Sequence, residues 1–237
     1  MLKALRPVAT KHGLIRLGPR GDGGYLIPND LAELEACFSP GVGHTSGFER
    51  DCAAAGMQVF MADGSVTGPA DSSDAFHFLR KNLGSITDGD TITLDDWVAE
   101  SLPGSNSDLL LQMDIEGAEF EALLHTTDRL LARFRIIVVE IHEMHRFAEP
   151  AFLDRAATTF GKILRNHVCV HIHPNNCCGS TEVAGVVVPY IAEFTFLHRD
   201  RVGHRLRRRF VDSFPHPLDA DNVPENGFLP LSPDWFA

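Results

Sequence analysis

The chain of 237 residues lacks any apolar run of about 18 residues, the length that a membrane-spanning helix needs. Its first residues, MLKALRPVATKHG, also lack the apolar core of a secretory signal peptide. Both absences predict a cytoplasmic protein with no membrane partner. Positive charge is scarce too, since 21 Lys and Arg are outnumbered by 32 Asp and Glu. The resulting net charge of −11 argues against a general nucleic-acid binder, which needs a basic surface.

Cysteine is equally scarce. The five cysteines are an odd number without framework spacing, and no C-x-x-C metal pair occurs. Cys177 and Cys178 are adjacent in the chain. For a cytoplasmic protein we expect reduced thiols and no disulfide scaffold.

What the sequence contains is typical of a soluble globular protein that buries a large core, with 44% hydrophobic and 22% charged residues. Short apolar runs alternate with segments of helical composition, and the last two runs are expected to pair antiparallel through a loop containing Gly179 and Gly185. This order predicts an α/β fold, a Rossmann-like, doubly wound and mostly parallel sheet with an antiparallel edge hairpin. The predicted strands are 37–39, 57–62, 76–79, 109–113, 134–142, 168–173 and 192–197, and the predicted helices are 46–55, 94–102, 118–133 and 152–165.

The length favours one such domain with additions at both ends. Residues 1–35 form an N-terminal extension, in which runs 14–17 and 25–27 flank the glycine-rich turn GPRGDGG and predict a hairpin. This hairpin either covers an edge of the sheet or contributes to substrate binding. Residues 36–200 form the sheet domain. Residues 201–237 form a tail with a basic run, 204–209, and many prolines. The basic run is a solvated face or meets an anionic substrate.

The stretch DLLLQMDIEGAEFEALL at 108–124 is the centre of the sequence. A buried strand ends at Met113, and Asp114 and Glu116 follow before a helix begins. Residues i and i+2 of an extended chain project to the same side, and ligands of doubly wound sheets bind beyond the carboxyl ends of the strands. The two carboxylates can therefore hold a cation, a metal or a substrate hydroxyl. In the alternative interpretation, Glu116 only caps the helix and Asp114 is only solvated.

An earlier unit reads strand, glycine turn, helix, strand and acid. The turn contains Gly41 and Gly43, and Asp63 ends the second strand twenty residues after Gly43. A glycine turn lets the backbone approach a nucleotide-like ligand, and an acid at this place can accept both ribose hydroxyls. The alternative is a tight turn without a ligand.

Two histidines also stand at strand ends. Glu140 and His142 end the strand 134–142, and His173 ends the strand 168–173. Either histidine can act as a general base near neutral pH. A divalent metal held by Asp114, Glu116, Glu140 or the histidines is an alternative, but neither His142 nor His173 is part of an H-x-x-x-H pair, which favours a metal-free site. Each histidine can also be purely structural.

Several stretches resemble the FkbM-type S-adenosylmethionine-dependent methyltransferases. They are SPGVGHTSGFE at 39–49, VFMADGS at 59–65, TLDDW at 93–97, QMDIEGAEFEAL at 112–123 and VVEIH at 138–142. HPNN at 173–176 and AEFTFL at 192–197 resemble a subgroup. DIEGAE is the specific motif among them, and together the stretches span most of the chain.

The resemblance implies that S-adenosylmethionine lies over the first two strands, beside Gly41 and Gly43, with Asp63 on the ribose and Gly64 and Ser65 beside the adenine. Many members begin the first motif with an acid, where this chain has Ser39. Glu49 or Asp114 then takes the methionine ammonium. The family usually methylates hydroxyl oxygens, often on sugars, which implies a sugar or small-molecule acceptor. The catalytic candidates are His142, His173, Asp114 and Glu116, and nothing in the sequence specifies an oligomeric state.

Three other functions remain open at this point. A metal-dependent hydrolase would use Asp114, Glu116, His142 and His173, but it leaves the Gly41–Asp63 unit without a role. A nicotinamide oxidoreductase would use the glycine turn, although its spacing departs from G-x-G-x-x-G. A non-catalytic binding module could share the same fold.

Overall fold

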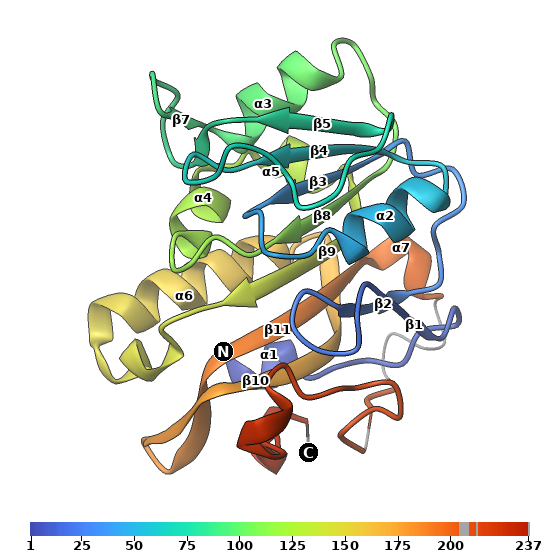
Figure 1. Cartoon of the computed structure of the whole chain (residues 1–237). Helices are drawn as coiled ribbons and strands as arrows, with labels where there is room; N and C mark the ends of the chain where they lie inside the picture. The colour runs from blue at the N-terminus through green and yellow to red at the C-terminus, as the bar shows by residue number, and fades with distance from the viewer. Residues whose placement is uncertain (204–208, 212, 237) are drawn as a thin grey trace.

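A seven-stranded sheet forms the centre of the structure, a computed structural model that describes residues 1–203, 209–211 and 213–236 (Figure 1). The strand order is β10-β11-β9-β8-β3-β4-β5. The strands are β3 (Ala36–Pro40), β4 (Gln58–Ala62), β5 (Phe76–Leu79), β8 (Leu109–Met113), β9 (Phe134–Ile141), β10 (His167–Val183) and β11 (Val186–His198).

All pairings from β5 to β9 are parallel, whereas β11 pairs antiparallel with both β9 and β10. In this sheet β11 therefore runs opposite to the other six strands, and the β10–β11 hairpin forms the edge of the sheet. The predicted fold class, a mostly parallel Rossmann-like sheet with an antiparallel edge hairpin, is confirmed. Among the described residues, no helix is long and apolar enough to span a membrane.

Helices cover both faces, and each face has its own apolar core. Alternate residues of β3 divide between the two cores: Phe38 packs in the core under α3 (Leu94–Ser101), whereas Cys37 packs in the core under α2 (Gly47–Ala54). The first core also contains side chains of α4 (Glu119–His125), α5 (Asp128–Leu131) and α6 (Pro150–Ile163). Strands buried on both faces are why these segments read as uninterrupted apolar runs.

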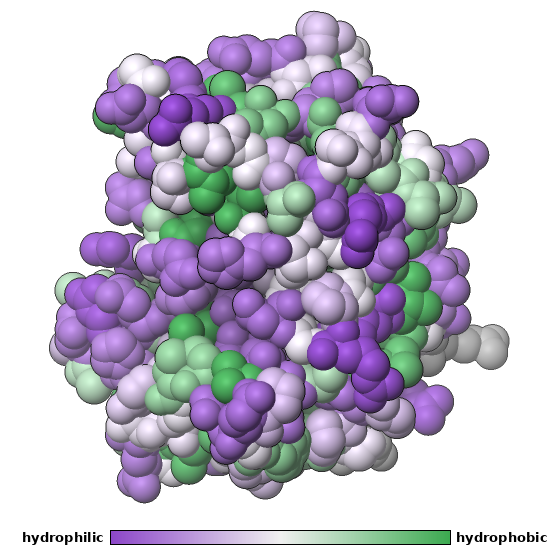
Figure 2. Space-filling view, in the orientation of Figure 1, coloured by the Kyte–Doolittle hydropathy of each residue, from purple (hydrophilic) through white to green (hydrophobic). Residues whose placement is uncertain are grey.

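The remaining elements are short and peripheral. They are α1 (Leu2–Leu5), β1 (Leu14–Leu17), β2 (Tyr25–Pro28), β6 (Asn82–Leu83), β7 (Thr91–Ile92), α7 (Arg199–Val202) and the 3₁₀ turns Met144–Ala148, Pro224–Asn226 and Pro233–Trp235. In Figure 2, the face that carries α2 and the β1–β2 hairpin shows hydrophobic residues in separate small groups among polar ones.

The N-terminal hairpin is present as predicted, with Leu14 opposite Pro28 and Leu17 opposite Tyr25. It lies on a face of the sheet, where the hydroxyl of Thr195 in β11 donates to the carbonyl of Leu26 at 2.7 Å. Because β2 packs against β9, β10 and β11, the hairpin covers the face of the sheet and not its edge.

The predicted helix 118–133 is wrong as a single element, because the chain divides it into α4 and α5. Thr126 adopts an extended conformation, and the hydroxyl of Thr127 accepts a hydrogen bond from the backbone N–H of Leu130. A threonine at such a place satisfies a free backbone donor and starts a new helix. Two successive β-branched residues therefore end one helix and begin another.

The predicted loop between the last two strands is also wrong, since both strands continue well past their predicted ends. Their turn is Ala184–Gly185, with φ values of 52° and 82°. Two successive residues with positive φ are typical of a tight hairpin turn. Gly179 (φ 83°) lies instead at a register shift between Asn175 and Ser180. Polar residues such as Ser180 and Thr181 hid these pairings, because this part of the hairpin is not buried on both faces.

The expectation of reduced cysteines holds for three positions and is wrong for two. Cys37, Cys52 and Cys169 are buried free thiols, whereas Cys177 and Cys178 form a disulfide between neighbours. Of the basic run in the tail, residues 204–208 lie outside the described residues.

A close approach between β3 and β8 requires glycine at position 41. Gly41 has a φ of 88°, and a Cβ atom there would stand 1.5 Å from the carbonyl oxygen of Asp114. We expect Gly41→Ala to lower the free energy of unfolding by about 3 kcal/mol or more, because it combines an unfavourable φ with a backbone clash. Urea titration measures the change.

Gly43→Ala is the matched control for this experiment. It lies two residues away, and a Cβ atom there meets nothing within 4 Å. Equal stability of the two variants would contradict the role assigned to Gly41.

Candidate functional site

A cavity of about 380 Å³ lies at the carboxyl ends of β3, β4 and β8, which we name the strand-end cavity. Its lining residues are Gly41, Ala62, Asp63, Ser65, Asn82, Leu83, Asp114, Ile115, Glu116 and Ala118. This is the edge where doubly wound sheets bind ligands. Five of the sequence-predicted site residues, Gly41, Asp63, Ser65, Asp114 and Glu116, line it together.

Asp63 is held in place at the end of β4 by backbone and side-chain donors. One carboxylate oxygen accepts from the N–H of Val42 at 2.9 Å, and the other accepts from the N–H (2.7 Å) and hydroxyl (2.6 Å) of Ser65. Partial burial raises the pKa of Asp63, but these hydrogen bonds outweigh it and leave the pKa below its usual value. Asp63 is therefore a fixed anion on the cavity wall.

The other residues predicted around Asp63 differ in their positions. The N–H of Gly64 donates to the amide oxygen of Asn82 at 3.0 Å, and a Cβ atom at Gly64 would come within 2.8 Å of that side chain. Gly43 faces open space and does not line the strand-end cavity.

Ser39 and Glu49 lie behind the cavity wall and do not line it. The Ser39 hydroxyl oxygen is 2.6 Å from Oε1 of Glu49 and 2.6 Å from Oε1 of Gln112. Burial raises the pKa of the Glu49 carboxyl, although the Ser39 hydrogen bond opposes this. The first turn of α2 thus places a carboxyl group beside Ser39, near the end of β3.

Asp114 is shared between the cavity and the N-terminal hairpin. Its Oδ2 accepts from the hydroxyl of Tyr25 at 3.2 Å, and its Oδ1 has no hydrogen-bond partner within the described residues. Burial raises the pKa of Asp114 to about 6, although the nearby His142 opposes this. A buried acceptor without a donor is a place where a ligand can supply one.

His142 lies among four carboxylates. Its Nδ1 is 2.9 Å from Oε1 of Glu119, whereas its Nε2 is 3.4 Å from Glu116, 3.7 Å from Glu140 and 3.8 Å from Asp114. A proton on Nδ1 bonded to Glu119 leaves Nε2 as an acceptor. Burial lowers the pKa of His142, but the Glu119 hydrogen bond and the surrounding charges outweigh it and raise the pKa above 6.5.

Glu119 holds the backbone of the DIEGAE turn as well as the imidazole of His142. Its Oε1 also accepts from the N–H groups of Gly117 at 2.9 Å and Ile115 at 3.3 Å, and the residue is 1% exposed. Glu116, in contrast, is almost fully exposed and has a φ of 56°. The carboxylate that holds the DIEGAE turn is therefore Glu119, not Glu116.

Glu140 stands beside this group at the end of β9. Its Oε1 accepts from the amide of Asn175 at 3.0 Å, and its Oε2 is buried without a partner within the described residues. Burial and the charges of Asp114 and Glu193 raise the pKa of Glu140 well above its usual range.

His173 is separated from His142. It lies on β10, opposite Glu193 of β11, and its Nδ1 is 3.6 Å from Oδ1 of Asp219 in the tail. Burial lowers the pKa of His173, but Asp219 and Glu193 outweigh it and raise the pKa. The two candidate histidines thus belong to different groups, one at β8–β9 and one at the β10–tail contact.

Tyr25, Glu119 and Asn82 are site residues that the sequence reasoning missed. Glu119 carried a readable signal, because it is the third acid of DIEGAE and lies in the first turn of a helix. Tyr25 and Asn82 had none, since a hairpin far away in the sequence and a two-residue strand bring them to the cavity.

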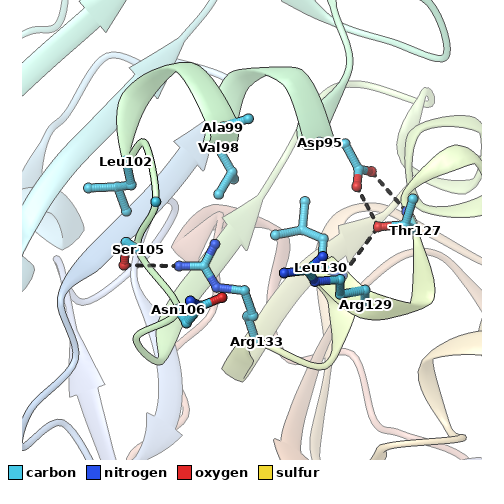
Figure 3. A pocket seen from close by; sticks show the side chains of 11 residues that line it. Asp95, Val98, Ala99, Leu102, Ser105, Asn106, Thr127, Arg129, Leu130 and Arg133 are labelled. Carbon is cyan, nitrogen blue, oxygen red and sulfur yellow. Dashed lines mark hydrogen bonds between the residues drawn. The ribbon is translucent and has the colours of Figure 1, made fainter.

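A second hollow, of about 360 Å³, lies between α3 and α5 (Figure 3). Apolar side chains such as Val98 and Leu130 share it with Arg129 and Arg133. The guanidinium of Arg133 is bonded to Ser105 and Ser107. The residues of this hollow precede β8 and β9, so it lies away from the strand-end cavity.

Comparison with protein families matches residues 26–166 to the methyltransferase FkbM domain. The chain belongs to this family. The match includes the strand-end cavity, His142 and Glu119, but leaves out His173 and the tail. No curated protein matches the chain.

Three solved structures show a weak similarity. A protein described as a methyltransferase from an antibiotic biosynthesis pathway of Anabaena variabilis is 10% identical with a TM-score of 0.31, and 60% of this chain covers 58% of that one. A protein described as an RNA methyltransferase of Pyrococcus horikoshii is 11% identical with a TM-score of 0.28, and the match covers 70% of this chain and 76% of that one. A 16S rRNA adenine methyltransferase of Catenulisporales acidiphilia is 10% identical with a TM-score of 0.32, covering 78% and 98%. The family assignment rests on the domain match alone.

The raised pKa of Asp114 predicts a pH-dependent effect on stability. The pKa of Asp114 is about 6 in the folded state and near 3.9 in the unfolded state. Ionisation of Asp114 therefore lowers the free energy of unfolding as pH rises through this window. We expect Asp114→Asn to be more stable than the wild type at pH 8, by about 1–3 kcal/mol, and to lose about half of this advantage at pH 5. Urea titration at both values measures the difference, and a variant less stable than the wild type at pH 8 would contradict this account.

Proposed function

We propose that this protein transfers a methyl group from S-adenosylmethionine to a hydroxyl oxygen of a sugar or a small metabolite in the cytoplasm. The observation that carries this proposal is the geometry of His142. Glu119 holds one ring nitrogen, and the other points to the acids at the strand ends, beside a cavity that also contains Asp63. The family supports methyl transfer, and the oriented imidazole supports an acceptor that must lose a proton.

The residues of the strand-end cavity fit the donor. Asp63 accepts three hydrogen bonds, and its Oδ2 retains one lone pair that can accept a ribose hydroxyl. A second ribose hydroxyl would take the place of the Ser65 hydroxyl on Oδ1, with Gly64 and Ser65 beside the adenine. The free Oδ1 of Asp114, with Glu49 behind Ser39, offers negative charge for the methionine ammonium. When bound, the donor supplies an electrophilic methyl group on a sulfonium.

The chain's own residues then act on the acceptor. With the donor bound, Nε2 of His142 would accept the hydroxyl proton as the oxygen takes the methyl group that the donor gives up as an uncharged thioether. Glu119 would stabilise the resulting imidazolium through Nδ1. Alignment of the hydroxyl with the methyl group supplies much of the acceleration.

A metal-assisted reaction is the second candidate, since Asp114, Glu119 and His142 each offer a ligand atom within 4.8 Å of one another. A hydrolase would use the same atoms. However, Oε1 of Glu119 already accepts from two backbone N–H groups and from Nδ1 of His142. A metal bound to this oxygen would compete with all three hydrogen bonds, which favours the metal-free base.

The donor-binding role of Asp63 gives a direct test. We expect Asp63→Ala to weaken S-adenosylhomocysteine binding at least about tenfold, because charge-assisted hydrogen bonds to the ribose are worth about 1.5–3 kcal/mol each. Titration calorimetry measures the affinity. Asp88→Ala serves as a control, because Asp88 also accepts backbone hydrogen bonds but is not a lining residue of the cavity. Unchanged affinity in Asp63→Ala would refute the assignment.

The pH profile tests the base. Only neutral His142 accepts a proton, so kcat/KM should rise with pH through a pKa above 6.5. Glu119→Gln removes the charge that raises this pKa, and the profile should shift to lower pH.

His142→Ala should lower kcat about a hundredfold with little change in donor affinity. Methyl transfer to an acceptor found by screening sugars and metabolites provides the rates.

His167→Ala is the matched control, because it removes a buried histidine that contacts the backbone carbonyls of Ile163 and Phe134 and does not line the strand-end cavity. A chelator should leave the wild-type rate unchanged. Loss of activity with chelator and its return with added metal would replace the His142 base by the metal-assisted reaction.

A further inference from the structure

The motif HPNN at 173–176 has no role in the strand-end cavity, and it lies outside the segment that matches the family. His173 instead lines another cavity, of about 380 Å³, which we name the tail cavity. Its other lining residues are Arg20 from the turn of the N-terminal hairpin and Pro215, Asp219, Ala220, Asp221, Pro224 and Phe228 from the tail. All of them lie outside residues 26–166.

The wall of the tail cavity is firmly held. The amide nitrogen of Asn176 donates to the carbonyls of Val223 and Gly227, both at 2.8 Å, and its oxygen accepts from the N–H of Val223 at 2.8 Å. Asp219 accepts from Nε2 of His171 at 2.9 Å and from the N–H of His216 at 2.7 Å. A cavity fixed in this way by hydrogen bonds needs little ordering when a ligand binds.

Buried polar atoms without hydrogen-bond partners lie between the strand-end cavity and the tail cavity. Cross-strand neighbours place Asp114, Glu140, Glu193 and His173 side by side on one face of the sheet, and we name these residues the buried polar row. Asn222 of the tail donates to Oε1 of Glu193 at 2.9 Å. Within the described residues, all but one of the buried polar side-chain atoms without a hydrogen-bond partner belong to this row or to Asn222. They are Oδ1 of Asp114, Oε2 of Glu140, both ring nitrogens of His173 and Oδ1 of Asn222.

The chemistry of the tail cavity selects its ligand. Arg20 and His173 disfavour a cation, whereas Asp219 and Asp221 disfavour an anion. Neutral hydroxyl groups suit both kinds of side chain, because they donate to carboxylates and accept from guanidinium and imidazole N–H groups. Phe228 is 55% exposed at the cavity and offers an apolar face to the C–H side of a ring.

We propose that the tail cavity binds a second sugar ring of the acceptor, so that the acceptor is an oligosaccharide or a glycoside longer than one ring. This inference rests on the proposed function. Asp114 and His173 are separated by three strand-to-strand steps of about 4.8 Å, about 14 Å in total. A single sugar ring is shorter than this distance and cannot reach both sites.

The test compares glucose with maltotriose and cellotriose, added to the full-length protein in the presence of S-adenosylhomocysteine. Titration calorimetry should show at least one trisaccharide binding about tenfold more tightly than glucose. Phe228→Ala should remove this advantage without changing the melting temperature. Phe210→Ala is the matched control, since Phe210 is 43% exposed and does not line the tail cavity. Asp221→Ala gives a second variant of the cavity itself.

Each outcome is decisive. Equal affinities for glucose and both trisaccharides, absence of binding by all three sugars, or an advantage that both Phe228→Ala and Asp221→Ala retain would overturn the second-ring site. Failure of S-adenosylhomocysteine to bind would overturn the proposed function instead. In that case the same sugar titrations without the nucleotide still decide whether the tail cavity binds a second ring.

Discussion

The buried carboxylate of Glu119 is the interaction on which the site depends. One of its oxygens holds the backbone of the DIEGAE turn and one nitrogen of His142 at the same time. The end of β8 and the end of β9 are thereby fixed relative to each other. Such a carboxylate costs desolvation, which three donors around one oxygen offset. The orientation of the imidazole follows from the same hydrogen bonds that shape the turn.

For the acids near Glu119, the cost of desolvation is not offset by hydrogen-bond donors. Asp114, Glu140 and Glu193 are close together on neighbouring strands, and burial raises the pKa of each. Glu193, with a pKa raised to about 7, shares its surroundings with His173. Like charges opposite each other destabilise a sheet. A protein that keeps such a row gives up stability for binding or chemistry, and this is why the row is more informative about function than the apolar cores around it.

The sequence predicted the fold well, because the apolar strands β3, β4, β8 and β9 are buried on both faces and leave clear runs between glycine turns. It failed where polar residues form regular structure, as at Ser180 and Thr181 in the long hairpin. The local site around Asp63 and Asp114 could be placed from strand ends alone. The separation of His142 from His173 could not, since β11 lies between β9 and β10 in the sheet and Asp219 reaches β10 from the tail. Tyr25 likewise reaches Asp114 across 89 positions of the chain.

The two ends of the chain meet. Arg6 donates to the carbonyl of Phe236 at 3.2 Å, Val8 forms a bridge with Phe210, and α1 packs against the 3₁₀ turn at Pro233–Trp235. Trp235 in turn is fully buried and donates to Val187 at the tip of the long hairpin. Residues 1–8 can therefore complete their packing only after residues 210–236 have been synthesised. The same proximity makes the chain suited to circular permutation, with the old ends joined by a short linker and new ends opened in an exposed loop.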